Sequence, residues 1–368
     1  MTKLMYGPAL ALSIAAFLGT VAVADTLTFP EATTDAACAL TDGTWYKDTC
    51  WAGFEDETIP ADEIDAVVEA RLAALDELAI TVDGVDYPVV DSRASVLGAT
   101  SLLAVVVVEM PEGLRSFATS IDLSSDDVAP LSLIDGNAIN VIFESQDTSS
   151  LEQMIIAQST TVERAEMDNG VEIRAQYDVD GYENVVFPFD TDILSVGTST
   201  LEIDGTKAIL NGELGLRAYQ QIKDLITNHP EVTTIVMGEV DGSVDDMVNV
   251  HTGRMIRKAG LSTEVLSDSL IASGGVDLFT AGVNRIVHKG AQIGIHSWCC
   301  FEGLTAIELP RDHPAHASQL DYYTLTLGPD VGPAFYFHTL EASPFDSVSF
   351  MSDEDIKSWT IATQFLPE

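Results

Sequence analysis

Strands and helices alternate along the C-terminal part of this chain, and this alternation constrains the fold more than any other feature. After about residue 198, short apolar runs typical of buried strands are followed by helical patterns. We expect strands at residues 207–210, 234–237, 263–266, 285–287 and 292–295, and helices at residues 214–228, 244–259 and 273–281. Such a pattern implies a largely parallel sheet with helical cover, and functional sites in these folds form at the carboxyl ends of strands.

The helix expected at residues 244–259 has clear signals at both ends. Ser243 is placed to cap its start, Asp245 and Asp246 lie in its first turn, and Gly260 ends it. Acidic residues at a helix N-terminus stabilise the helix dipole, and we interpret these two in that way.

The preceding part of the chain has a different pattern. One helix is expected at residues 63–80, followed by short β-rich runs separated by Asp, Gly, Ser and Pro. We expect strands at residues 80–82, 102–108, 138–143, 171–177 and 184–187, and a helix at residues 149–158. The fold class is therefore α/β, with a β-rich α+β N-terminal domain of unknown function at residues 25–197 and a second domain at residues 198–368.

The first 24 residues are typical of a Sec signal peptide. Lys3 supplies a positive charge, residues 9–23 are apolar, and Ala22-Val23-Ala24 is a small-residue cleavage site. We expect cleavage after Ala24 and a periplasmic or secreted protein, with an uncleaved anchor as the alternative.

The chain is strongly acidic. It has 58 Asp and Glu residues against 17 Lys and Arg residues, a formal net charge of −41. Such a surface repels phosphate backbones, so we expect no nucleic-acid partner. Solubility in a salty environment explains this charge better than a specific cationic partner.

Four cysteines fall into two pairs. Cys38 and Cys50 flank a turn-rich segment, and in an oxidising compartment we expect them to form a disulfide. Cys299 and Cys300 are adjacent, and a ring between neighbouring cysteines is strained. We therefore expect these two to be free, buried thiols.

Ser273 and His296 offer the chemistry of a nucleophile and a base. The serine starts a helix and the histidine follows a strand, so the fold can bring them together. A serine nucleophile also needs two backbone N–H groups aimed at the developing negative charge. Gly274 follows the serine directly, and Gly242 lies after a neighbouring strand, just before the helix expected at residues 244–259. A serine before a helix can also be simply its cap.

These residues carry a resemblance to a known family. Residues 239–245 read EVDGSVD, residues 256–263 read IRKAGLST, residues 273–275 read SGG, and residues 294–296 read GIH, with Ala281-Gly282 and Arg285 between the last two. Farther on, residues 320–323 (LDYY) and 350–355 (FMSDED) fit the same order. From about residue 202 to 363 the chain resembles the Clp-peptidase/crotonase superfamily, most closely its exported Clp-like bacterial members.

The resemblance implies a Clp/crotonase-like ββα-superhelix domain and a set of roles. Ser273 is the nucleophile, His296 the general base, and Gly242 and Gly274 the oxyanion donors. Asp346 is placed as the third catalytic residue, and Asp321 is the other candidate. The family commonly forms rings, so a homo-oligomer is expected.

The sequence departs from the family pattern at residues 239–241, where Glu-Val-Asp replaces Ser-Pro-Gly. Asp241 places a carboxylate beside the expected oxyanion site, and a negative charge there opposes a developing oxyanion. The second departure is Gly274-Gly275 in place of Ala-Cys, which loosens the helix start.

Other titratable residues have simpler interpretations. Residues 311–316 (RDHPAH) resemble a metal patch, but a solvated loop fits better because a third ligand is missing. Lys258 and Lys289 fall where helix ends and turns place lysines, and His288 is expected to be exposed. We expect neither a metal nor a cofactor.

The function expected from these observations is an exported serine-peptidase-like hydrolase that forms an acyl-enzyme on short or unfolded peptides. The sequence contains no ATPase segment, so no ATPase partner is inferred. A catalytically degenerate binding or assembly module on the same fold is the alternative, and acyl-CoA chemistry ranks third because the net charge disfavours an anionic ligand.

Overall fold

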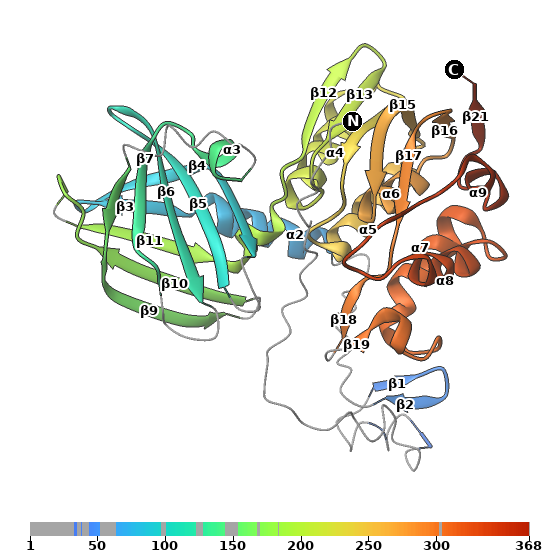
Figure 1. Cartoon of the computed structure of the whole chain (residues 1–368), viewed down its shortest axis with the longest axis horizontal. Coiled ribbons are helices and arrows are strands. Elements are labelled where there is room, and N and C mark those ends of the chain that lie inside the picture. The colour runs from blue at the N-terminus through green and yellow to red at the C-terminus, as the bar shows by residue number, and fades with distance from the viewer. Residues whose placement is uncertain are drawn as a thin grey trace. The chain divides into compact units, whose positions relative to one another are not determined.

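The structure is a computed structural model of the whole chain (Figure 1). It describes residues 33–34, 38, 44–51, 64–96, 101–122, 128–143, 154–167, 170–182, 184–301 and 304–367. The leader predicted at residues 1–24 lies outside them. Two compact units are present: Asp65–Thr198, and Ser199–Glu368 together with the residues up to Ile64. Among the described helices, none combines the length and the apolar character needed to cross a bilayer.

The unit Asp65–Thr198 is built on one curved antiparallel sheet (Figure 1). Its nine strands follow the order β8-β7-β6-β5-β4-β3-β11-β10-β9. The strands are β3 (Ala79–Val82), β4 (Val85–Val96), β5 (Ser101–Met110), β6 (Gly113–Asp122), β7 (Leu131–Asp135), β8 (Ile155–Ala157), β9 (Ser159–Met167), β10 (Gly170–Tyr177) and β11 (Val185–Asp190). Alternate residues of these strands, including Val106, Phe117 and Phe187, form one apolar core. The prediction of a β-rich part in a mixed α/β chain is confirmed.

Short helices accompany this sheet: α2 (Ile64–Asp76), α3 (Ile139–Phe143) and a 3-10 turn at Thr191–Ser195. Arg71 of α2 donates a buried 2.9 Å hydrogen bond to Asp192 of that turn. The strand predicted at residues 138–143 is wrong, because the Asn137 side chain accepts from the N–H of Ile139 and starts a helical turn instead. The helix predicted at residues 149–158 is wrong where it can be checked, since Ile155–Ala157 pairs as β8 with β7.

The second unit contains the alternating pattern. Its main sheet has the order β12-β13-β14-β15-β16-β21, in which β12 and β13 are antiparallel and the later neighbours are parallel. The strands are β12 (Thr200–Asp204), β13 (Lys207–Asn211), β14 (Thr234–Val240), β15 (Ser262–Ala272), β16 (Arg285–His288) and β21 (Gln364–Leu366). Crossover helices α4 (Leu216–Asn228), α5 (Asp246–Lys258) and α6 (Gly274–Thr280) connect the parallel strands. The largely parallel sheet predicted from the alternation is confirmed.

A second layer extends from the long strand β15. Its outer half pairs with β17 (Gln292–Ile295), and β17 pairs in turn with β20 (Ser349–Phe350). The remaining elements are the hairpin β18 (Cys299–Phe301) and β19 (Leu304–Thr305), the helices α7 (Ala317–Leu327), α8 (Gly332–Ala342) and α9 (Asp353–Ser358), and 3-10 turns at Ala306–Glu308 and Pro314–His316. Ser273 directly follows the carboxyl end of β15, next to the residues that pair with β17.

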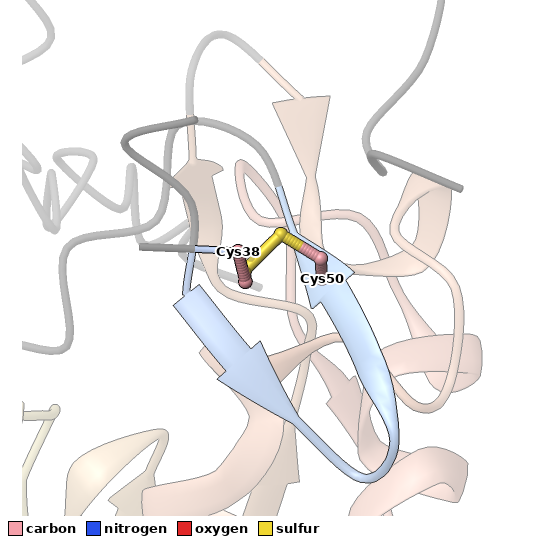
Figure 2. Close-up of a disulfide and its surroundings, with 2 residues drawn as sticks. All are labelled: Cys38 and Cys50. Atoms are coloured by element: carbon pink, nitrogen blue, oxygen red, sulfur yellow. A yellow bond between two sulfur atoms is a disulfide. The ribbon is translucent and has the colours of Figure 1, made fainter. Parts of the chain in front are cut away.

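A small hairpin precedes α2, formed by β1 (Thr44–Tyr46) and β2 (Thr49–Trp51). The predicted disulfide between Cys38 and Cys50 is present, with Cα atoms 5.4 Å apart (Figure 2). Trp51 is 3% exposed and its ring contacts the His313 ring at a centroid distance of 4.8 Å. The other cysteine prediction is wrong at Cys299, which is buried as expected but disulfide-bonded rather than free.

Candidate active site

Ser273 lies between β15 and α6 in a backbone conformation that is rare for a residue with a side chain. Its φ is 53° and its ψ is −127°. The N–H of Ser273 donates to the carbonyl of Gly294 at 3.1 Å, and its own carbonyl accepts from Val276 at 2.8 Å. Positive φ is strained for an L-residue, and such strain concentrates at functional sites. A serine on a sharp, strained strand-to-helix turn is the geometry that exposes hydrolase nucleophiles.

The hydroxyl of Ser273 does not act as a helix cap. The residue occupies the N-cap position of α6, but its side chain makes no capping hydrogen bond. A capping serine accepts from an N–H in the first turn, which satisfies one of the free donors there. The simpler interpretation of Ser273 therefore fails, and its side chain lines a pocket.

Gly242 and Gly274 lie directly against the serine. A Cβ added to Gly242 would be 3.2 Å from the Cβ of Ser273 and 3.6 Å from its Oγ. Leu214 holds the Gly242 turn in place, because its N–H donates to Gly242 at 2.9 Å and its carbonyl accepts from Val244 at 2.8 Å. In the described part of the chain, neither glycine N–H donates a hydrogen bond. Two free donors therefore flank the serine, as an oxyanion site requires.

Asn249 fixes the start of α6. Its Nδ2 donates to the carbonyl of Gly274 at 2.9 Å, and the residue is 2% exposed. A Cβ on Gly274 would contact both Asn249 and Ser243 closely. Two glycines lower the intrinsic stability of the helix start, but close packing leaves no room for a Cβ at Gly274 or Gly275.

His296 follows β17 and lines the same pocket as Ser273. Burial lowers its pKa below the ordinary 6.5, while the backbone at Ser297 and Phe345 and the charge of Asp246 partly oppose this shift. Its Nδ1 is buried and makes no hydrogen bond within the described chain. Among the described residues no hydrogen bond joins the imidazole to Ser273 Oγ, although both side chains line the same pocket.

The structure does not bring the predicted third residue to this pocket. Asp346 is exposed and is not one of the pocket-lining residues, and the same holds for Asp321. Asp241, expected beside the oxyanion site, is also exposed and outside the pocket lining. The roles assigned to Ser273, His296 and the glycines stay predictions.

A carboxylate that the sequence analysis assigned to helix stability lines the pocket instead. Asp246 accepts a 2.5 Å hydrogen bond from Ser243 Oγ, while Asp245 caps α5 through a 3.0 Å bond from the N–H of Val248. Desolvation raises the pKa of Asp246 although part of the residue is exposed, and the bond from Ser243 acts against that shift. The helix start and the cap at Ser243 were therefore predicted wrongly, because Ser243 holds Asp246 rather than capping α5.

Asp277 is a second carboxyl group in the pocket, and the sequence analysis did not single it out. It is 6% exposed, lies in the first turn of α6, and accepts a short hydrogen bond from the hydroxyl of Tyr323. Burial raises its pKa to about 7, against which the Tyr323 bond acts, and the charge of Asp246 adds to the rise. The signal that could have found it is an acidic residue inside the apolar run Val276–Phe279.

The pocket as a whole joins these groups to apolar walls. Its lining consists of Asp246, Ser273, Val276, Asp277, Ile295, His296, Ser297, Trp298, Gln319, Tyr323 and Thr339. A serine hydroxyl, an imidazole of lowered pKa and two carboxyl groups of raised pKa thus share one partly apolar space. This composition suits acid–base work on an acyl group.

The other titratable residues lie outside this pocket. His313 and His316 are 1% and 0% exposed, so the solvated loop predicted at residues 311–316 is wrong for both histidines, while Arg311 and Asp312 are exposed. Nδ1 of His316 hydrogen-bonds the Tyr336 hydroxyl at 2.7 Å, and burial lowers the pKa of His316 to about 4. The described residues contain no group of three side chains that could hold a metal.

His288 also differs from its expected exposure. Its Nε2 lies 2.8 Å from the buried carboxylate of Glu264, which also accepts a 2.5 Å bond from Lys207. Lys258 and Lys289 are exposed and away from the pocket, as their sequence positions indicated.

Comparisons with known proteins give a likeness to solved structures of enoyl-CoA hydratase type. No model of a protein family matches the chain, and none of the curated proteins matches it. A solved enoyl-CoA hydratase/carnithine racemase from Magnetospirillum magneticum is 10% identical, with a TM-score of 0.32 over 47% of this chain and 70% of that chain. Enoyl-CoA hydratase from Bacillus anthracis has 10% identity and a TM-score of 0.32 over 46% and 70%, and an enoyl-CoA hydratase/isomerase from Marinobacter aquaeolei has the same identity and score over 46% and 71%. The likeness covers about half of the chain at low identity and low score, so it identifies no activity.

Proposed function

We propose that this protein is a hydrolase that cleaves an acyl bond, in a short peptide or another acyl compound, through an acyl-enzyme on Ser273. His296 takes the proton from Ser273 Oγ as the oxygen attacks the carbonyl carbon. The carbonyl electrons move onto oxygen, where the N–H groups of Gly242 and Gly274 stabilise them. The leaving group departs with the proton from His296, and a water molecule, deprotonated by His296, then releases the acid and restores the serine.

The observation that carries this proposal is the conformation of Ser273. The residue has φ of 53°, yet its hydroxyl does not cap the helix that follows. A strained backbone conformation that gains no capping hydrogen bond is expected where a side chain must be presented to a substrate.

The electrostatics of the pocket support the same roles. Because burial lowers the pKa of His296, its imidazole is neutral at pH 7 and can accept a proton. The charge of Asp246 favours the imidazolium that forms during the reaction. Since no side chain orients Nδ1 of His296, we assign a serine–histidine dyad rather than a triad.

Labelling with a fluorophosphonate probe tests the assignment. The wild-type protein is expected to form an adduct, and Ser273→Ala and His296→Ala are expected to lose it. Ser267→Ala is the matched control, since Ser267 is an exposed serine of the same strand β15. Absence of labelling on wild-type protein with a cooperative unfolding transition would rule out the hydrolase and favour the catalytically degenerate binding or assembly module.

A second candidate, proton transfer in the manner of a hydratase or isomerase, is favoured by the two carboxyl groups. Asp277 has a pKa of about 7 and lies in the pocket with Asp246. A carboxyl with that pKa can give or take a proton at a carbon next to a carbonyl whose oxygen the glycine N–H groups hold. Turnover kept in Ser273→Ala but lost in Asp277→Asn identifies this chemistry, whereas the reverse identifies the acyl-enzyme.

The proposal includes export and self-association. The sequence of residues 1–24 supports export, and a mature chain beginning at Asp25 is the expected result of N-terminal analysis after secretion. A homo-oligomer is expected from the family resemblance, and light scattering across a wide concentration range tests it.

A further inference from the structure

Three large apolar side chains lie exposed on one short segment between α8 and the end of β20. Phe345, Val348 and Phe350 are 37%, 41% and 45% exposed. We call this set the apolar rim. Single exposed apolar residues are ordinary, but three within six residues form a patch that needs a reason.

The apolar rim packs against β17, the strand that precedes His296. Val348 and Phe350 lie over Gly294, where an added Cβ would collide with both side chains. Gly294 accepts the hydrogen bond from the N–H of Ser273, and it pairs with Ala272 in the sheet. The rim is therefore one strand position away from the serine.

The base lies beside the same segment. His296 directly follows β17, two residues after the Gly294 on which the rim packs. The backbone at Phe345 acts on the His296 ring and raises its pKa against the effect of burial. The rim segment therefore lies next to the backbone of both Ser273 and His296.

Hydrogen bonds hold the rim in position. Ser297 donates its N–H to Ser343 at 2.8 Å, and Met351 donates its N–H to Ile293 at 2.9 Å, so both ends of the segment are anchored to β17 and the residues after it. Within the segment, the hydroxyls of Ser343 and Ser347 are 2.8 Å apart. A preorganised apolar surface loses little freedom when a ligand covers it.

Charge limits the ligand further. Asp246 lines the pocket, and the net charge of the chain is −41, so an anionic acyl group is repelled. We propose that the apolar rim binds the side of an uncharged, bulky apolar acyl group and thereby selects the substrate of the Ser273 reaction. This inference rests on the proposed hydrolase function.

A pair of esters tests the inference on the full chain. With p-nitrophenyl hexanoate and p-nitrophenyl acetate, we expect a kcat/KM at least about tenfold higher for the hexanoate, since a few buried methylene groups are worth that much. Phe350→Ala is expected to lower the hexanoate value about five- to tenfold while leaving the acetate value unchanged. Leu325→Ala is the matched control, because Leu325 is 49% exposed on α7, an element that contributes no residue to the rim.

The outcomes separate this inference from the function on which it rests. If no hydrolysis depends on Ser273, the proposed function itself is wrong. If hydrolysis depends on Ser273 but shows no preference for the hexanoate, only the role of the rim is wrong. The same conclusion follows if Phe350→Ala and Phe345→Ala leave that preference unchanged. Phe345→Ala serves as the second variant if Phe350→Ala does not fold. N-acetyl-leucine p-nitroanilide compared with its glycine analogue distinguishes a peptide source of the apolar group from an ester source, and a rim-dependent preference for leucine assigns the peptide.

Discussion

The hydroxyl of Tyr323 donates a hydrogen bond to Oδ1 of Asp277, joining α7 to the first turn of α6 beneath the candidate nucleophile. Both residues are buried, at 2% and 6% exposure. The bond favours the ionised carboxyl, yet burial outweighs it and raises the pKa of Asp277 to about 7. A carboxyl group held partly neutral at physiological pH makes the stability of this domain depend on pH.

Replacing Asp277 with Asn is expected to stabilise the protein above neutral pH. Between the ordinary pKa of 3.8 and about 7, the unfolded chain loses its proton while the folded one keeps it, so wild-type stability falls as pH rises and levels off above about 7. Asn has no such cost and still accepts from Tyr323. The gain is on the order of 4 kcal/mol at most near pH 8 and close to zero near pH 4. Denaturant unfolding at both pH values measures it, and an equal gain at both would contradict a raised pKa.

Ser273→Gly is expected to stabilise the protein by about 1 kcal/mol, because glycine adopts a φ of 53° without strain. Ser273→Ala keeps both the strain and the Cβ, and the hydroxyl that it removes makes no capping bond, so its stability should stay within about 0.5 kcal/mol of wild type. Both variants should lose fluorophosphonate labelling. Equal stability of the two variants would argue that the conformation of Ser273 carries no strain.

The sequence predicted the backbone of the site better than its charges. Strict alternation placed Ser273 after a parallel strand and His296 after the neighbouring one, because parallel strands and crossover helices follow from that pattern. Gly242 was expected beside the serine and lies there, since its turn ends the adjacent strand. These positions depend on local periodicity and sheet topology, and both can be inferred from a single sequence.

The titratable partners could not be predicted in this way. Asp246 resembled a dipole-stabilising residue, and its place in the pocket depends on Ser243 turning toward it rather than toward the helix N–H groups. His316 resembled a loop residue, yet long-range packing with Tyr336 buries it. Side-chain contacts between residues far apart in sequence set these environments, and no local pattern records them.

Among the polar residues of the unit that contains Ser199–Glu368, Arg285 is the one whose replacement is expected to lower the free energy of unfolding most. It is 8% exposed and donates to four carbonyls, at 2.6 Å to Ile361, 3.2 Å to Gly282, 3.2 Å to Thr360 and 3.4 Å to Thr326. These carbonyls lie at or just beyond the C-terminal ends of α6, α7 and α9, where a cation is favourable. Burial lowers its pKa to about 10, so the guanidinium is still charged at pH 7.

Arg285→Met should therefore destabilise the protein by about 3 kcal/mol or more, because it leaves several buried carbonyls without donors. Arg285→Lys keeps the charge but not the fork of donors, and an intermediate loss is expected. Arg311→Met is the surface control, because the Arg311 side chain is 65% exposed and its ion pair with Glu341 lies at the surface, so a change of less than about 1 kcal/mol is expected. Equal losses for Met and Lys at position 285 would show that the shape of the guanidinium, rather than its charge, is what the helix ends require.

The pH profile of acylation should report the pKa of His296. Burial is the largest influence on that pKa and lowers it below 6.5, so the neutral, base form persists into mildly acidic solution. The rate of fluorophosphonate labelling is expected to be level near pH 7 and to fall at acid pH, with a midpoint below 6.5. Asp246→Asn should move the midpoint lower still, since the charge of Asp246 raises the pKa of His296. A midpoint that rises or stays unchanged in Asp246→Asn would mean that the charge of Asp246 does not raise the pKa of His296. Asp246 would then be expected to contact the substrate.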